Sequence, residues 1–319
     1  VRWADLEPAD EEFRWRPFDR VLAEVRKYNA EHHQSPRTLH IRVMGGEHVP
    51  GWFEGAGVRM YDTLDPHRLR GKLSYRPIRI PMPYGNPGFL EQLRQVYAAM
   101  RDRYGDDPVV TVYHGTWSAG PWDEIFHPQD DAPLPPGYSE ERFVEGMIEQ
   151  LDVLIDEFCL HGKVAELPYS GKYPPKSQVD ITGPLTARIV ARLGRRSPFL
   201  YIQSNGWGVT GDGTPTISWG HQRDIDDAFG QVNLALQAIG TNAGGGWLAQ
   251  GDWIDSVTLA KRYEAAYLEV YYADFMPLDE THRLAAAFNH DGGATGVAPG
   301  FLGFRPWLKS PGGGRTPAW

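Results

Sequence analysis

The chain has 319 residues and a formal net charge of −9 at pH 7. This charge argues against polyanionic partners, so we expect neither nucleic acid nor an acidic membrane surface as a partner. No apolar run approaches the ~18 residues that a transmembrane helix requires. Cys159 is the only cysteine, which excludes an intramolecular disulfide framework.

The aromatic content is high, with 11 tryptophans and 15 tyrosines. One interpretation is a large core, and the other is a set of flat platforms for sugar rings. Aromatic faces with polar rims suit both roles.

The first third of the chain predicts strands and helices in alternation. Val1 is neither an initiator methionine nor the start of a signal peptide, so we expect that residues preceded it. The cellular location stays open, with secretion as the preferred expectation. The patterns predict a short strand over residues 1–8, a helix over 17–33, a strand over 38–44, a Pro- and Arg-rich loop over 52–84 and a helix over 88–104.

A run of β-branched and other apolar residues follows at positions 109–114 (VVTVYH) and predicts a buried strand. It breaks at Gly115 into a loop that carries Trp117, Trp122 and Glu124. A strand that leads into tryptophans and a carboxylate is typical of the edge of a sugar-binding active site.

The second half repeats this alternation. Helical spacing predicts helices over residues 139–158 (with Ser139 as the cap), 180–193, 224–239, 256–266 and 280–289. Apolar runs predict strands over residues 163–169, 198–204, 246–250 and 268–272, with a long Gly/Thr loop after 204.

Strands that alternate with helices favour a parallel sheet with crossover helices. The pattern predicts a single-domain α/β protein, a (β/α)8 TIM barrel over residues 1–290 with a Gly/Pro-rich tail over 291–319 that packs on it; a doubly wound open sheet is the second interpretation. About seven strands are recognised. The missing one either preceded Val1 or is supplied by residues 301–304 of the tail, as in a permuted barrel.

Three stretches together resemble the catalytic barrels of clan A glycoside hydrolases, particularly the β-galactosidase-like members. VRWADLEP, followed by a helix with Phe18-Asp19, resembles their second strand, and TLHIRV resembles the third. VVTVYHGTW, with the later WDE, is similar to the fourth, where those enzymes place the acid/base glutamate. The resemblance implies a glycosidase that cleaves a poly- or oligosaccharide.

The chain departs from that family at two positions. Clan A enzymes carry an asparagine-glutamate dipeptide at the end of strand four, and this sequence contains none. Their nucleophile is a glutamate that ends strand seven, where this chain offers Gln250 and Asp252. Either the machinery is rearranged, or the barrel binds glycans without cutting them.

Glycoside hydrolysis needs two carboxyl groups, about 5–5.5 Å apart for retention of configuration and about 6.5–9.5 Å for inversion. Glu124 is the first candidate for the general acid/base because Trp117 and Trp122 are near it in sequence; a solvated loop carboxylate is the alternative. A retaining mechanism is preferred. The candidates for the second carboxylate are Glu269 and Glu166, each within an apolar strand, and Asp252 by resemblance.

Each of these partners has a structural alternative. Glu269 could form a salt bridge with an inward arginine such as Arg42, and Asp252 could belong to a turn. Glu7 and Glu47 are interpreted as sugar hydroxyl ligands or structural residues.

Side chains at predicted strand ends are candidates for substrate contacts. Trp117, Trp122, Trp207 and Trp247 would serve as ring platforms, with burial in the core as the alternative for each. His114, Gln203, Asn205 and Arg42 would bind hydroxyl groups.

Two other motifs lack the neighbouring residues or elements that their function requires. Residues 206–211 (GWGVTG) match the dinucleotide-binding fingerprint but lead into Asp212-Gly213-Thr214-Pro215 and not into a helix. Residues 116–120 (TWSAG) lack one glycine of a nucleophile elbow. No zinc-binding spacing of histidines or cysteines is present, so we expect no metal and no cofactor.

Overall fold

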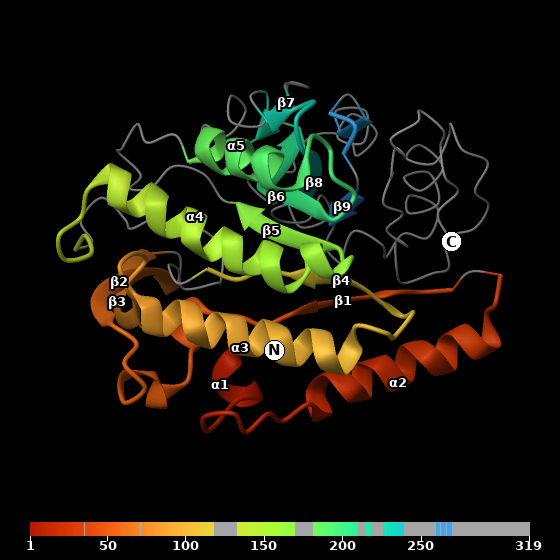
Figure 1. Cartoon of the computed structure of the whole chain (residues 1–319), viewed down its shortest axis with the longest axis horizontal. Coiled ribbons are helices and arrows are strands. Elements are labelled where there is room, and N and C mark those ends of the chain that lie inside the picture. The colour runs from red at the N-terminus through yellow and green to blue at the C-terminus, as the bar shows by residue number, and fades with distance from the viewer. Residues whose placement is uncertain are drawn as a thin grey trace.

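The structure is a computed structural model, shown in Figure 1. It describes residues 1–34, 36–69, 72–117, 133–169, 181–209, 215–217, 226, 228–238, 260–261, 263–265 and 267–269.

A seven-stranded sheet forms the centre of the described part and joins its strands in chain order. Neighbouring strands on this path pair in parallel, and β7 (Pro215–Ile217) adds to β6 in the antiparallel direction. The strands of the path are β1 (Leu39–Arg42), β4 (Val110–His114), β5 (Ala165–Tyr169), β6 (Leu200–Val209), β8 (Asn233–Ala238) and β9 (Tyr267–Glu269).

The N-terminus extends this order by one position beyond β1. Arg2 forms an isolated parallel bridge with Met44, and the backbone N–H of Met44 donates to the carbonyl of Val1 at 2.8 Å. The chain then enters the short helix α1 (Trp3–Leu6). The strand expected over residues 1–8 is therefore wrong beyond its first residues, because the backbone turns helical at Trp3.

The strand order supports one of the two expected folds. A doubly wound sheet reverses its order at a switch point, and the described strands run in sequence without a reversal. Sequential parallel strands are what a (β/α)8 barrel requires. No pairing of β9 with the N-terminal edge occurs among the described residues, so closure of the barrel stays a prediction.

Helices lie along one side of this sheet (Figure 1). The hydroxyl of Ser139 accepts from the backbone N–H of Arg142 at 3.2 Å, which caps α4 as expected. None of the described helices has both the length and the apolar character needed to cross a membrane. The helices are α2 (Arg16–Glu31), α3 (Pro87–Tyr104), α4 (Glu140–Glu157) and α5 (Thr182–Leu193), with 3₁₀ turns at Gly46–His48, Gly51–Glu54 and Cys159–His161.

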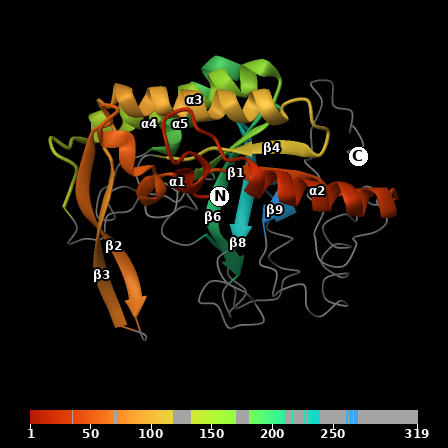
Figure 2. The same cartoon turned by 90° about the horizontal axis from the view of Figure 1, so that it is seen from below.

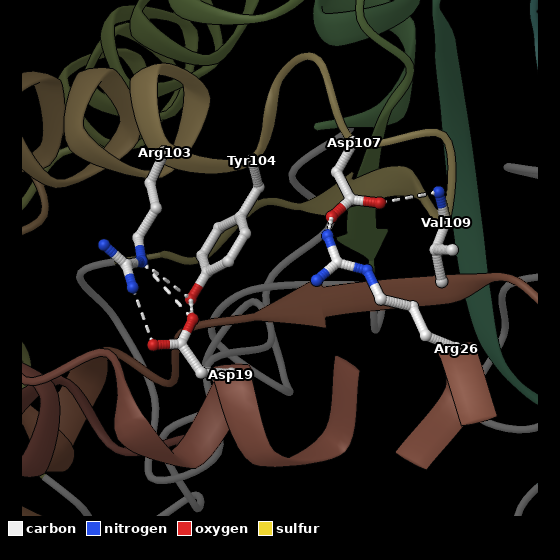
Figure 3. A network of polar contacts seen from close by, with 6 residues as sticks. All are labelled: Asp19, Arg26, Arg103, Tyr104, Asp107 and Val109. Carbon is white, nitrogen blue, oxygen red and sulfur yellow. Dashed lines mark hydrogen bonds and ion pairs between the residues drawn. The ribbon is translucent and has the colours of Figure 1, made fainter. Parts of the chain in front are cut away.

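A polar network joins α2 to α3 and to the start of β4 (Figure 3). The Asp19 carboxylate accepts from Nη2 of Arg103 at 2.6 Å and from the Tyr104 hydroxyl at 2.8 Å. Asp107 pairs with Arg26 and accepts from the backbone N–H of Val109 at 2.9 Å. These contacts fix the entry into the strand that ends at His114.

The expected loop over residues 52–84 is wrong, because it contains a β-hairpin. Strands β2 (Met60–Leu69) and β3 (Lys72–Pro81) pair in antiparallel register over their whole length. Pro66 and Pro77 obscured the strand pattern, yet proline is tolerated in a ribbon where every strand is an edge. The hairpin extends to the side toward which β6 and β8 point (Figure 2).

The expected helix over residues 224–239 is also wrong in its second half, which forms β8. β8 pairs directly with both β6 and β9, so it takes the place in the sheet that the sequence interpretation gave to residues 246–250. The strand expected over 198–204 continues to Val209 and replaces the start of the expected loop. Residues 246–250 and 280–289 and the tail over 291–319 lie outside the described residues.

Candidate functional site

One row of the sheet places ionisable side chains next to one another. The register pairs Arg42 with His114, His114 with Glu166, and Glu166 with Tyr201. Residues that pair across neighbouring parallel strands project to the same side of a sheet. The row therefore brings a guanidinium, an imidazole, a carboxylate and a phenol to one face.

This face is the one turned away from the helices. The alternate residues Tyr113 and Ala165 belong to the apolar core, and the Tyr113 ring stacks on Phe158 at a centroid distance of 4.4 Å. Because successive strand residues project to opposite faces, His114 and Glu166 face the other way. In a closed barrel that side is the interior.

His114 and Glu166 form the centre of the row. Nδ1 of His114 lies 3.3 Å from Oε1 of Glu166. The two residues are only 5% and 1% exposed, respectively. Nε2 of His114 is buried and has no hydrogen-bond partner among the described residues.

The surroundings of His114 oppose a second proton on its ring. Burial, followed by the positive charge of Arg42 and the neighbouring His40, lowers the pKa of His114 well below its ordinary value. Burial also lowers the pKa of His40 to about 4. Both imidazoles are therefore neutral at neutral pH, and Arg42 is the cation of the row.

The strands continue this face toward their carboxyl ends. Gln203 lies two residues beyond Tyr201 and is fully buried, and its backbone pairs with Pro168 and Ala235. Two residues further along β6, Asn205 pairs with Gln237, which pairs with Glu269. The backbone of Glu269 thus occupies a position nearer the strand ends than the row of Glu166.

The exit of β4 is held by contacts with both neighbouring strands. The backbone N–H of Gly115 donates to the carbonyl of Glu166 at 2.6 Å, and the hydroxyl of Thr116 accepts from the backbone N–H of Gly45 at 2.8 Å. A Cβ atom on Gly45 would lie 2.5 Å from that hydroxyl oxygen. The close approach therefore requires glycine at position 45.

Trp117 lies in the core of the described structure. Its ring is fully buried, and its indole N–H donates to the carbonyl of Pro168 at 2.6 Å. This contact ties the exit of β4 to β5. These contacts favour the interpretation of Trp117 as a core residue. A role as a sugar platform stays a prediction.

The remaining candidates are only partly described. Trp122, Glu124, Trp247 and Asp252 lie outside the described residues, and of Asn205, Trp207 and Glu269 the backbone alone is described. Their roles stay predictions. Among the described residues, no group of three or more His, Cys, Asp or Glu side chains could hold a metal ion.

Glu7 and Glu47 make the contacts of structural residues. The buried Glu7 accepts from the Trp3 indole N–H at 2.8 Å and from the backbone N–H of Glu11 at 3.0 Å. Glu47 accepts from Nη2 of Arg76 through both oxygens at 2.6 Å.

Sequence reasoning did not single out His40 and Tyr201. Each lies two residues before a residue that was recognised, Arg42 and Gln203 respectively. The period-2 alternation of a strand was the signal that could have identified both.

No protein-family model matches the sequence, and no curated protein matches it. Among solved structures, the chain is similar to a β-galactosidase from Bacillus circulans sp. alkalophilus, with 11% identity and a TM-score of 0.36 over 64% of this chain and 34% of that one. A β-galactosidase from Rahnella sp. R3 gives 12% identity and a TM-score of 0.35 over 64% and 33% of the two chains.

Endo-glycoceramidase II from Rhodococcus sp. gives 12% identity and a TM-score of 0.41 over 86% of this chain and 64% of that chain. The chain thus spans about a third of the length of the β-galactosidases that it matches, at 34% and 33%.

Proposed function

We propose that this protein is a glycoside hydrolase that acts on a poly- or oligosaccharide. The observation that carries the proposal is the row of Arg42, His114 and Glu166 on the face turned away from the helices, in which His114 and Glu166 are buried. Burial of charged groups is costly, and it is retained where a site needs them. The sequence resemblance to clan A barrels points to the same chemistry.

The positions of Arg42 and His114 within their strands support this proposal. In (β/α)8 barrels the catalytic residues lie at the carboxyl ends of the strands. His114 is the last residue of β4, and Arg42 is the last residue of β1. A ligand that binds there would meet a guanidinium donor, an imidazole and a carboxylate, which are groups that bind sugar hydroxyls.

In this proposal Glu124 is the general acid/base, and its partner is a carboxylate near the strand ends. The backbone register favours Glu269 over Glu166 for that partner. Along the strands, Glu269 is four residues beyond the row of Glu166, or about 13 Å at ~3.3 Å per residue. Glu166 lies deeper, beside His114.

The experiment is digestion of a polysaccharide panel and of 4-nitrophenyl glycosides, with the products identified. We expect Glu124→Gln to lower turnover at least 100-fold, because general acid–base catalysis contributes about 10²–10⁴, while affinity for the glycan is kept. Glu91→Gln is the matched control on the exposed surface of α3, where Glu91 pairs with Arg94 of its own helix. An unchanged rate in Glu124→Gln would contradict the assignment.

The absent asparagine-glutamate dipeptide favours a second candidate, a barrel that binds carbohydrate without cleaving it. The same panel separates the two, because affinity electrophoresis measures binding independently of turnover. Retardation by a glycan that the protein leaves intact would support the binding function.

A further inference from the structure

The two ring nitrogens of His114 have different surroundings. Nδ1 lies 3.3 Å from Oε1 of Glu166, within ion-pair distance, and a contact that tightens on ligand binding would let a ring N–H donate to the carboxylate. Nε2 is buried and has no hydrogen-bond partner among the described residues. Such an atom in a native structure marks a place for a water molecule or a ligand. The partner of one nitrogen also determines the state of the other.

We propose that Glu166 holds His114 as a neutral ring with its proton on Nδ1, so that Nε2 accepts a hydrogen bond from a hydroxyl of a bound sugar. This inference rests on the proposed function and specifies what its substrate must present at this point. Glu166 is then a positioning residue that acts through His114, and it is not the hydrolytic partner of Glu124.

The charges around the ring favour this state. Arg42 is level with His114 in the sheet, and His40 precedes it by two residues on β1. Burial of the ring and the positive charge of Arg42 oppose an imidazolium and lower the pKa of His114. A neutral imidazole with Nδ1–H directed at Glu166 leaves a lone pair on Nε2.

The chemistry of Nε2 selects the class of ligand. A carboxylate or carbonyl oxygen would place its own lone pair against the lone pair of Nε2. The ligand atom at this position must therefore be a hydrogen-bond donor. A metal ion is disfavoured, because the Arg42 guanidinium is adjacent in the register and no three-ligand cluster exists among the described residues. A neutral sugar hydroxyl fits these conditions.

The tautomer can be measured without turnover. The full chain is labelled with ¹⁵N-histidine, and long-range ¹H–¹⁵N correlations are recorded, with His114 assigned by comparison with His114→Gln. We expect a neutral ring protonated on Nδ1 at about pH 7. A protonated Nε2, or an imidazolium at this pH, overturns the proposal.

Glu166→Gln tests the positioning role. An amide in place of a carboxylate partner gives the wrong histidine tautomer, so we expect the Nε2–H form of His114 to appear. Glu7→Gln is the matched control, because Glu7 is an equally buried carboxylate whose contacts are with Trp3 and Glu11. If both variants leave the tautomer unchanged, Glu166 does not position the ring.

Titration with D-galactose and with D-glucose tests the ligand. We expect at least one sugar to shift the Nε2 resonance of the wild type and to bind about tenfold more weakly to His114→Gln. No shift with either sugar, as for a site that holds only water, overturns the sugar assignment. Sugar binding at Nε2 without cleavage of any glycoside would refute hydrolysis alone, whereas hydrolysis with a protonated Nε2 would refute this inference alone.

Discussion

At the scale of single residues, Glu7 and Glu166 show two uses of a buried carboxylate. Glu7 has a donor for each oxygen, the Trp3 indole and the backbone of Glu11, and burial raises its pKa. Glu166 instead faces an imidazole whose second nitrogen has no partner among the described residues. Each oxygen of Glu7 therefore has a donor within the protein, whereas Nε2 of His114 can still accept a hydrogen bond from a ligand.

This difference predicts the effect of Glu7→Gln. In Glu7→Gln the side-chain NH₂ group would face one of the two N–H donors that now bind a carboxylate oxygen. We therefore expect a loss of about 1–3 kcal/mol in the free energy of unfolding. Urea denaturation measures it. The exposed Glu12, whose contact is with the equally exposed Arg14, is the control, and Glu12→Gln should stay within about 0.5 kcal/mol of the wild type. Equal stability of the two variants would contradict the structural role of Glu7.

Individual roles were only partly predictable from the sequence. A carboxylate within an apolar strand indicated Glu166, because such burial needs a reason. The burial of Trp117 was not predictable, since its indole N–H is accepted by Pro168, which is 51 residues away. The residues around Trp117 in the sequence give no indication of a contact with so distant a residue.

At the scale of elements, helices α2 to α5 follow from the local spacing of apolar residues, and all four were predicted. The hairpin β2–β3 and strand β8 were missed, because prolines interrupt one and the apolar spacing of the other also suits a helix face. Pairing with β6 and β9 makes β8 a strand, and this tertiary context overrides the local pattern.

The junction of α2 with α3 gives a prediction at this scale. Hydrogen bonds from Arg103 and Tyr104 lower the pKa of Asp19 against the opposing effect of burial. A lowered folded pKa contributes stability above the unfolded value of about 3.9, and this is lost as the pH falls through the folded value.

Asp19→Asn should therefore reduce the free energy of unfolding by about 0.5–1 kcal/mol at pH 7, a value set by the partial exposure of this pair. The difference from the wild type should vanish toward pH 2–3. Chemical denaturation at several pH values measures it, with Asp102→Asn as the control on the neighbouring surface. A pH-independent difference would show that the charge of Asp19 is not its cause.

At the scale of the whole molecule, the face of the sheet away from the helices is polar and also buried. An open sheet with helices along one side would leave Glu166 and Gln203 in contact with solvent, yet they are 1% and 0% exposed. A closed barrel covers this face with its own opposite wall. Together with the sequential strand order, this burial leads us to expect closure.

Closure predicts how the backbone amides of β9 exchange with solvent. In an open sheet β9 would be an edge strand, and the amides directed away from β8 would have no ladder partner. In a closed barrel they are paired on both sides, so every amide of Tyr267–Glu269 should exchange about as slowly as those of β4. Hydrogen exchange followed by NMR measures this. Fast exchange confined to alternate amides of β9 would identify a free edge and leave the open parallel sheet as the fold.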